Sequence, residues 1–180
     1  IQDAENIAWK LAAILNGEAG PGLLASYERE RILAADENIG HSTRSTDFIA
    51  PHSQAERNLR NAVLDLAPRC EFARRMVNSG RLSVASVYDT PLSTPDEDVF
   101  SGTARLGAPA PDVPVRTADG KQDYLLAQLA GGFELLYVKD GARPAPPDGI
   151  KLTEIGSDLI DEAGLFAERF DATPGAAYLL

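Results

Sequence analysis

The first 80 residues carry apolar side chains at the spacing of α-helices. Between residues 2 and 16 they recur every three or four positions, and acidic residues stand in the first turn, where negative charge suits the helix dipole. Asn16-Gly17 is a stop signal. A second helix is predicted over about 23–39, and residues 40–48 could continue it.

A third helix is predicted to begin after Pro51. Ser53 is a favourable N-cap, and Glu56 stands three residues later, which is the spacing of a capping box. Pro68 interrupts the pattern, and a short helix over 71–77 follows it.

The pattern changes after residue 80. Residues 80–117 hold many of the prolines, several glycines and short β-branched runs, a composition typical of extended, linker-like structure. We place the linker at 81–105, with a domain boundary near Thr103.

From about Leu106 the period changes again. The apolar run 133–138 is bounded by Gly-Gly and Asp-Gly, and its length favours a buried strand. Strands that alternate with helices indicate an α/β layer structure. The other elements predicted here are a helix over 124–129, a strand over 151–155, an amphipathic helix over 159–170 and a strand that starts at Tyr178.

Composition narrows the classes of partner. The 180 residues carry a formal net charge of −10, and an acidic surface repels nucleic acids and anionic membranes. No apolar run approaches the roughly 20 residues of a membrane helix, and the acidic amino terminus is unlike a signal peptide. The single cysteine fits a reducing compartment, so we expect a cytoplasmic protein.

The first seventeen residues, IQDAENIAWKLAAILNG, resemble a segment of the class A flavoprotein monooxygenases, the relatives of para-hydroxybenzoate hydroxylase and phenol hydroxylase. In that family a glycine-rich turn runs into a helix with this pattern. Ile7 stands where leucine is common. The matching residues are Ile1, Gln2, Asp3, Ala4, Asn6, Ala8, Trp9, Lys10 and Leu11.

Further matches are spread along the chain. Ser26-Tyr27 with Glu30-Arg31 resembles the family's S-Y-x-x-E-R, although Leu33 stands where proline is frequent. Two later segments resemble the phenol hydroxylase branch. The connection into its carboxy-terminal domain is matched by Tyr88, Pro91-Leu92 and 107–112, and that domain, which is thioredoxin-like, by 132–136 and 170–180.

The resemblance implies an α+β fold in which a helical segment from the end of an FAD-binding domain precedes a truncated thioredoxin-like α/β domain. The implied division is 1–80 for the helical segment, 81–105 for the linker and 106–180 for a redox-inactive thioredoxin-like domain. The implied parent enzyme binds FAD, uses NAD(P)H as reductant and hydroxylates an aromatic small molecule.

The resemblance also places the flavin near the amino end of the first helix, where free N–H groups and the helix dipole favour negative charge. Ile1 and Gln2 are therefore the candidate cofactor-binding residues, at the edge of a flavin site whose main residues would lie upstream. The alternative is a plain amphipathic core helix. We expect no catalytic residue and no metal ligand in this chain, because it has no His/Cys cluster and residues 96–98 lack the ligand pattern of a calcium loop.

Four residues of the first two matching motifs, those in residues 1–17 and 26–31, are expected to have structural roles. Trp9 should pack against its neighbours, and Lys10 should extend a solvated tip. Glu30 and Arg31 should form ion pairs that fix helix packing, each contributing about 0–1 kcal/mol if exposed.

Cys70 is the remaining candidate for chemistry. Arg69, Arg74 and Arg75 are close in sequence and would favour a reactive thiolate, but a lone cysteine is usually a small buried hydrophobe. A thioredoxin-type motif would follow the strand at 133–138, and residues 139–144, KDGARP, contain no cysteine, which argues against dithiol exchange. The two histidines, His41 and His52, are expected on the surface.

Three hypotheses on function follow. In the first, the chain is the carboxy-terminal part of an aromatic monooxygenase and is itself structural, since both ends look like cuts in a longer protein. In the second, it is a stand-alone thioredoxin-fold interaction or dimerisation module. In the third, it is a redox protein that uses Cys70. Apolar helix faces and an unpaired strand edge also predict self-association, as a homodimer.

Overall fold

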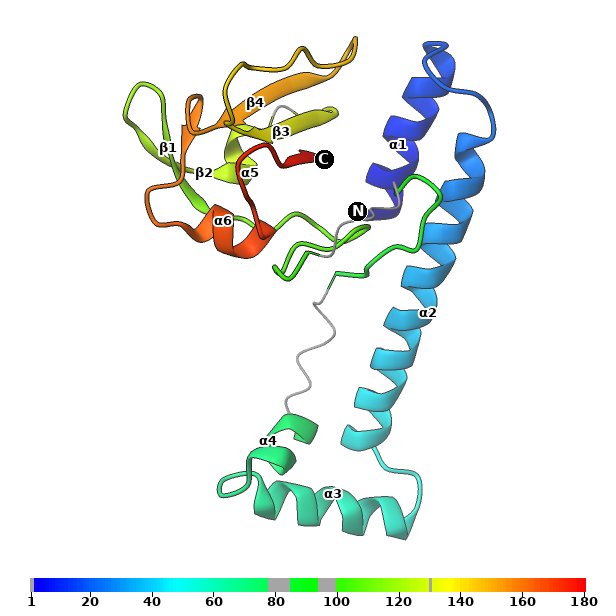
Figure 1. The fold of residues 1–180 in the computed structure, drawn as a ribbon. Coiled ribbons are helices and arrows are strands. Elements are labelled where there is room, and N and C mark those ends of the chain that lie inside the picture. Colours follow the sequence, from blue (N-terminus) through cyan, green and yellow to red (C-terminus); the bar gives the residue numbers. More distant parts are fainter. Residues whose placement is uncertain (1, 78–84, 94–99, 130) are drawn as a thin grey trace. The chain divides into compact units, whose positions relative to one another are not determined.

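The computed structural model describes residues 2–77, 85–93, 100–129 and 131–180. The chain divides into two compact units, Ile1–Ser93 and Thr94–Leu180, and the division falls inside the segment predicted to be a linker. The regular elements in the described part of the first unit are all helices, and the second unit contains a mixed sheet (Figure 1). The fold class is α+β, as the sequence predicted.

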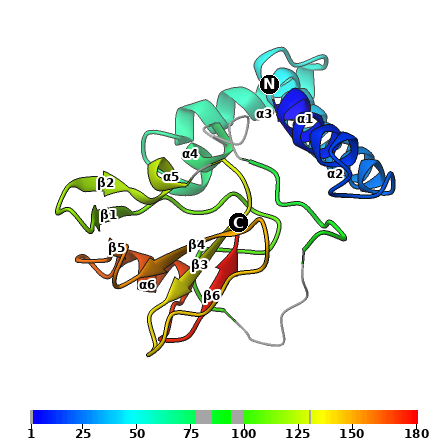
Figure 2. The ribbon, with the colours of Figure 1, turned by 90° about the horizontal axis from the view of Figure 1, so that it is seen from above.

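The first unit begins with a helical hairpin. Helix α1 (Gln2–Leu15) ends at a turn in which Gly17 has a φ of 75°, and α2 (Leu23–Ile49) then runs back beside α1 (Figures 1 and 2). A left-handed backbone of this kind favours glycine, so the stop signal at Asn16-Gly17 is confirmed. Residues 40–48 continue α2 without a break.

A narrow stripe of α2 is buried. Ser26, Glu30 and Ala34 lie four residues apart, which places them on one side of the helix. Two large apolar residues of the same helix lie outside this stripe, because Leu24 is 36% and Ile39 64% exposed. Small side chains and one charged residue, rather than large apolar ones, therefore form the contact surface.

Helix α3 (Gln54–Leu66) begins with the predicted capping box. The Ser53 side chain accepts a hydrogen bond from the Glu56 backbone N–H at 3.2 Å, and the Glu56 carboxylate accepts one from the Ser53 N–H at 2.8 Å. Helix α4 (Glu71–Val77) contacts α3, and the two helices bury Ala73 and Val63 respectively.

The second unit is built on a six-stranded sheet with the order β2-β1-β5-β4-β3-β6. Strands β3 and β4 are parallel, whereas β1 pairs antiparallel with β2 and β5, and β6 pairs antiparallel with β3 (Figure 2). The elements are β1 (Pro114–Thr117), β2 (Gln122–Tyr124), α5 (Leu125–Gln128), β3 (Glu134–Val138), β4 (Lys151–Ile155), β5 (Leu159–Ile160), α6 (Leu165–Phe170) and β6 (Ala177–Leu179).

The second unit has its own hydrophobic core. Phe166 and Phe170 of α6 stack with ring centroids 4.4 Å apart, and the Tyr178 ring meets Phe170 edge to face at 5.3 Å. Aromatic pairs favour both arrangements beyond the area that they bury. The other buried members are Val113, Val115, Leu125, Leu136, Ile155 and Leu159.

Two predictions for this unit need correction. The helix predicted over 159–170 is wrong in its first half, because Leu159 and Ile160 pair with β1, and Gly164, with a φ of 68°, separates them from α6. Their apolar side chains fit the helical period, but the neighbouring strand supplies ladder hydrogen bonds that the local pattern cannot reveal. Strand β1 was likewise missed inside the proline-rich stretch.

We predict that Gly102→Ala destabilises the second unit. A Cβ at Gly102 would overlap the Arg169 carbonyl oxygen and lie 2.8 Å from the Asp171 backbone nitrogen, so the backbone must shift. Such overpacking typically costs about 1–3 kcal/mol. Gly132→Ala is the matched control, because nothing lies within 4 Å of its Cβ position. Denaturant unfolding followed by circular dichroism checks this, and equal stabilities of the two variants would contradict it.

Candidate functional site

A buried ion pair joins α1 to α2. Lys10 Nζ lies 2.7 Å from Glu30 Oε2, and the side chains of Lys10 and Glu30 are 0% and 4% exposed. The same carboxylate oxygen accepts a hydrogen bond from Asn6 Nδ2 at 2.8 Å, and Oε1 accepts one from the Thr90 hydroxyl at 2.6 Å. Three donors from α1 and the segment at 85–93 therefore satisfy one carboxylate.

The expectation of a solvated tip for Lys10 was wrong. Lys10 is fully buried, whereas the Trp9 side chain is 37% exposed, and the Lys10 ammonium lies 5.3 Å from the centroid of the Trp9 ring. That distance is within the range of a cation–π contact. Periodicity assigns lysine to the solvent, but the carboxylate on the facing helix makes the buried position favourable.

The Glu30 carboxylate is held in its charged form. Burial raises its pKa, but the hydrogen bonds from Lys10, Thr90 and Asn6 lower it by more, so the pKa lies below the usual 4.5. A carboxyl group with a lowered pKa stabilises the folded state when it is ionised.

A second ion pair reaches the first turn of α1. Arg31 Nε donates to Asp3 Oδ1 at 2.5 Å, and Arg31 Nη1 donates to the Tyr88 hydroxyl. Burial lowers the pKa of Arg31, but the hydrogen bonds and negative charges of Asp3 and Tyr88 together raise it by more, so the net shift is upward. Glu30 and Arg31 thus form the ion pairs that the sequence predicted, and both join α1.

The two candidate cofactor-binding residues stand at the start of α1. Gln2 is the first residue of the helix and is exposed, and Ile1 lies outside the described residues. The first N–H groups of a helix have no acceptor within the helix, and the dipole makes that end positive. Arg31 balances the Asp3 charge at this end, and Glu5 of the same turn is exposed.

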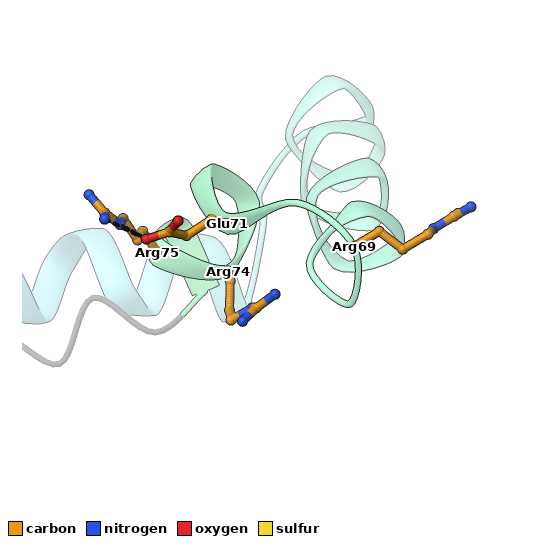
Figure 3. A pocket seen from close by; sticks show the side chains of 4 residues that line it. All are labelled: Arg69, Glu71, Arg74 and Arg75. Carbon is orange, nitrogen blue, oxygen red and sulfur yellow. Dashed lines mark hydrogen bonds and ion pairs between the residues drawn. The ribbon is translucent and has the colours of Figure 1, made fainter.

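The arginines around Cys70 do not form a site. They line an open pocket of about 380 Å³ with Glu71, but Figure 3 shows the side chains of Arg69, Arg74 and Arg75 pointing in different directions. Arg75 is paired with Glu71 at 2.5 Å. Cys70 itself is a free thiol of intermediate burial.

The loop after β3 is held by polar contacts rather than by a thiol. Lys139 Nζ donates to Ser157 Oγ at 2.7 Å, and Arg143 contacts Asp158 at 2.8 Å and the Leu152 carbonyl oxygen at 2.9 Å. These contacts give no support to the third hypothesis, a redox protein that uses Cys70.

The remaining candidates are surface groups. His52 is 79% exposed and lies 3.7 Å from Asp47, and His41 is within 3.4 Å of Arg44. Across the described ranges, no group of histidine, cysteine and acidic side chains could hold a metal ion. Residues 96–98 lie outside the described part of the chain. No described helix has both the length and the apolar character needed to cross a membrane.

The family match and the similar solved structures define the broad class of protein that this chain resembles. Residues 1–42, which contain α1 and most of α2, match a family described as "FAD binding domain". Over nearly its whole length the chain superimposes on OxyS anhydrotetracycline hydroxylase from Streptomyces rimosus, with a TM-score of 0.62, 25% identity and coverage of 99% of this chain and 34% of that one. It also matches the Diels-Alderase PyrE3, with a TM-score of 0.54, 28% identity and coverage of 99% and 31%.

Sequence relatives narrow the class. The chain is 31% identical over 144 residues to the uncharacterized aromatic compound monooxygenase YhjG of Bacillus subtilis, a match covering 79% of this chain and 27% of that protein. It is 29% identical over 177 residues to a 3-(3-hydroxy-phenyl)propionate/3-hydroxycinnamic acid hydroxylase of Mycobacterium sp. strain KMS, covering 96% and 28%.

The chain therefore spans little more than a quarter of the length of these relatives. It is similar to the class A FAD-dependent aromatic hydroxylases, which confirms the resemblance that its motifs carried.

We predict that acid weakens the first unit through Glu30. Because the folded-state pKa of Glu30 is lowered, its contribution is fully present above about pH 5 and is lost as pH falls through the lowered value. Glu30→Gln should lower the free energy of unfolding at neutral pH and make that free energy depend less on pH below about 5.

Trp9, the only tryptophan, reports unfolding by fluorescence. Glu28→Gln, an exposed site on the same helix, is the control. Parallel pH profiles for Glu30→Gln and the unsubstituted chain would contradict this assignment.

Proposed function

We propose that this chain is part of an FAD-dependent, NAD(P)H-using monooxygenase that hydroxylates an aromatic small molecule. The observation that carries the proposal is the match of residues 1–42 to an FAD-binding family, on a helix pair that a buried ion pair holds together. The names of the sequence relatives, an aromatic compound monooxygenase and a hydroxylase, support the aromatic substrate.

Within that enzyme, the start of α1 would lie at the edge of the FAD site. The backbone N–H groups of the first turn and the exposed Gln2 would contact the cofactor, and Arg31 would neutralise Asp3 beside them. Bound FAD would supply the redox chemistry, and the protein would supply orientation and electrostatics. Ile1 remains a proposed contact as well.

The 180-residue chain itself has a structural rather than a catalytic role in this proposal. The second unit has its own core, and Lys139 and Arg143 of the loop after β3 are bound by Ser157 and Asp158. We also propose the division into a helical segment, a linker and a thioredoxin-like domain at 1–80, 81–105 and 106–180.

The oligomeric state and the compartment are proposed from exposed side chains and composition. Exposed apolar residues on α3 and α4 support a homodimer: Leu59, Leu64, Phe72 and Met76. The single cysteine supports the cytoplasm as the compartment.

A different reaction on the same fold is the competing candidate. PyrE3 is described as a Diels-Alderase. Its sequence identity to this chain, 28%, exceeds the 25% identity of the hydroxylase OxyS. A shared fold does not fix the chemistry. A stand-alone interaction module without enzymatic activity is the alternative if no FAD is bound.

We predict that the full-length protein purifies with FAD and oxidises NAD(P)H faster when an aromatic substrate is added. The 180 residues alone should bind FAD with a dissociation constant weaker than about 10 μM, because tighter binding needs a built nucleotide site. Flavin absorbance, flavin titration and NAD(P)H consumption measure the three quantities.

The outcomes separate the hypotheses. Bound FAD without substrate-stimulated NAD(P)H oxidation would favour the competing reaction. A full-length protein that binds no FAD would leave only the interaction module. Tight FAD binding by the 180 residues alone would overturn the structural role of the segment.

A further inference from the structure

The segment at 85–93 presents alternate side chains to the helical hairpin. Ser86, Tyr88 and Thr90 are half-buried, whereas Ala85, Val87 and Asp89 are exposed. Extended backbone sends successive side chains to opposite sides. Tyr88 and Thr90 therefore share the inward side, although the segment lies far beyond the residues that match the FAD-binding family.

Thr90 completes the coordination of a buried charge. Its hydroxyl donates to Glu30 Oε1 at 2.6 Å, while Glu30 Oε2 takes donors from Lys10 and Asn6 of α1. Glu30 is 4% exposed, so water cannot easily replace a missing donor. Thr90 is therefore linked to the middle of α1 through the Glu30 carboxylate of α2.

Tyr88 makes a second link, nearer the start of α1. Its hydroxyl accepts a hydrogen bond from Arg31, whose side chain is only 11% exposed and which also donates to Asp3 in the first turn. One link thus reaches the first turn of α1 and the other reaches its middle. Two attachment points along a helix restrict both its position and its rotation.

We propose that Tyr88 and Thr90 form a clasp that positions α1 against α2 for FAD binding, which makes them positioning residues of the FAD site. This inference rests on the proposed function, since both links end on the segment that matches the FAD-binding family. The clasp lies outside that match and has no expected contact with the cofactor. It acts through Glu30 and Arg31.

The residue between them provides a matched control. Asp89 pairs with Arg29 at 2.6 Å, but the two side chains are 83% and 55% exposed. Exposed ion pairs contribute little to stability because water and salt compete for both charges. Asp89→Asn therefore removes a contact of the same segment with the same helix without touching a buried group.

The experiment uses the full-length protein and compares Tyr88→Phe, Thr90→Val, their combination, Thr90→Ser and Asp89→Asn. The first readout is amide hydrogen exchange of residues 2–15 without FAD, and the second is the FAD dissociation constant. The double variant should exchange these amides faster and bind FAD about tenfold more weakly, because two part-buried hydrogen bonds are lost. Thr90→Ser keeps the hydroxyl and should retain the affinity, and Asp89→Asn should stay within about twofold.

Each outcome decides the matter. Faster exchange with unchanged FAD affinity would overturn the positioning role and leave a purely structural contact. Unchanged exchange would overturn the clasp itself. If Thr90→Ser bound FAD as weakly as Thr90→Val, the hydroxyl would not be the cause, and the inference would fail. An unsubstituted protein that binds no FAD would refute the proposed function and the positioning role, while the exchange measurement would still report on the clasp.

Discussion

The helical unit depends on one charged carboxylate. Glu30 is almost completely buried, and an ion in that environment is tolerated only with close partners of opposite charge and with hydrogen bonds. Asn6 and Lys10, four residues apart on one side of α1, both donate to one of its oxygens, and Thr90 donates to the other. Ser26 and Ala34, one turn to either side of Glu30, leave room for the close approach of α1. The packing of α1 against α2 follows from satisfying this group.

The need to satisfy the buried Glu30 carboxylate also connects the fold to the proposed FAD binding. The start of α1 is the part of the chain that would meet FAD, and its position is set by Glu30 and Arg31 rather than by a large apolar interface. The second unit builds a separate core from the phenylalanines of α6 and the residues of the sheet. Its loop after β3 is closed by the Arg143–Asp158 pair, at the place where a thioredoxin-type enzyme would carry its cysteines.

Local patterns predicted the elements better than their contacts. The helical period located α1, and the capping box located the start of α3, because both signals lie within a few neighbouring residues. The burial of Lys10 was missed because its partner is 20 residues away, and the role of Thr90 was missed because its partner is 60 residues away. The local pattern predicts helix where strand β5 forms, because the partner strand of β5 lies far away in the sequence. Gln2 was chosen from a family motif and remains a prediction.

The coupling between Lys10 and Glu30 tests the central claim most directly. Unfolding free energies would be measured by Trp9 fluorescence for Lys10→Met, Glu30→Leu and the double variant. Each single substitution leaves a buried polar group without its partner and should destabilise the unit by about 3–5 kcal/mol, and the double variant should be destabilised by clearly less than the sum. Small, additive losses would contradict the account, because they would mean that the pair is solvated and that other contacts hold the helices together.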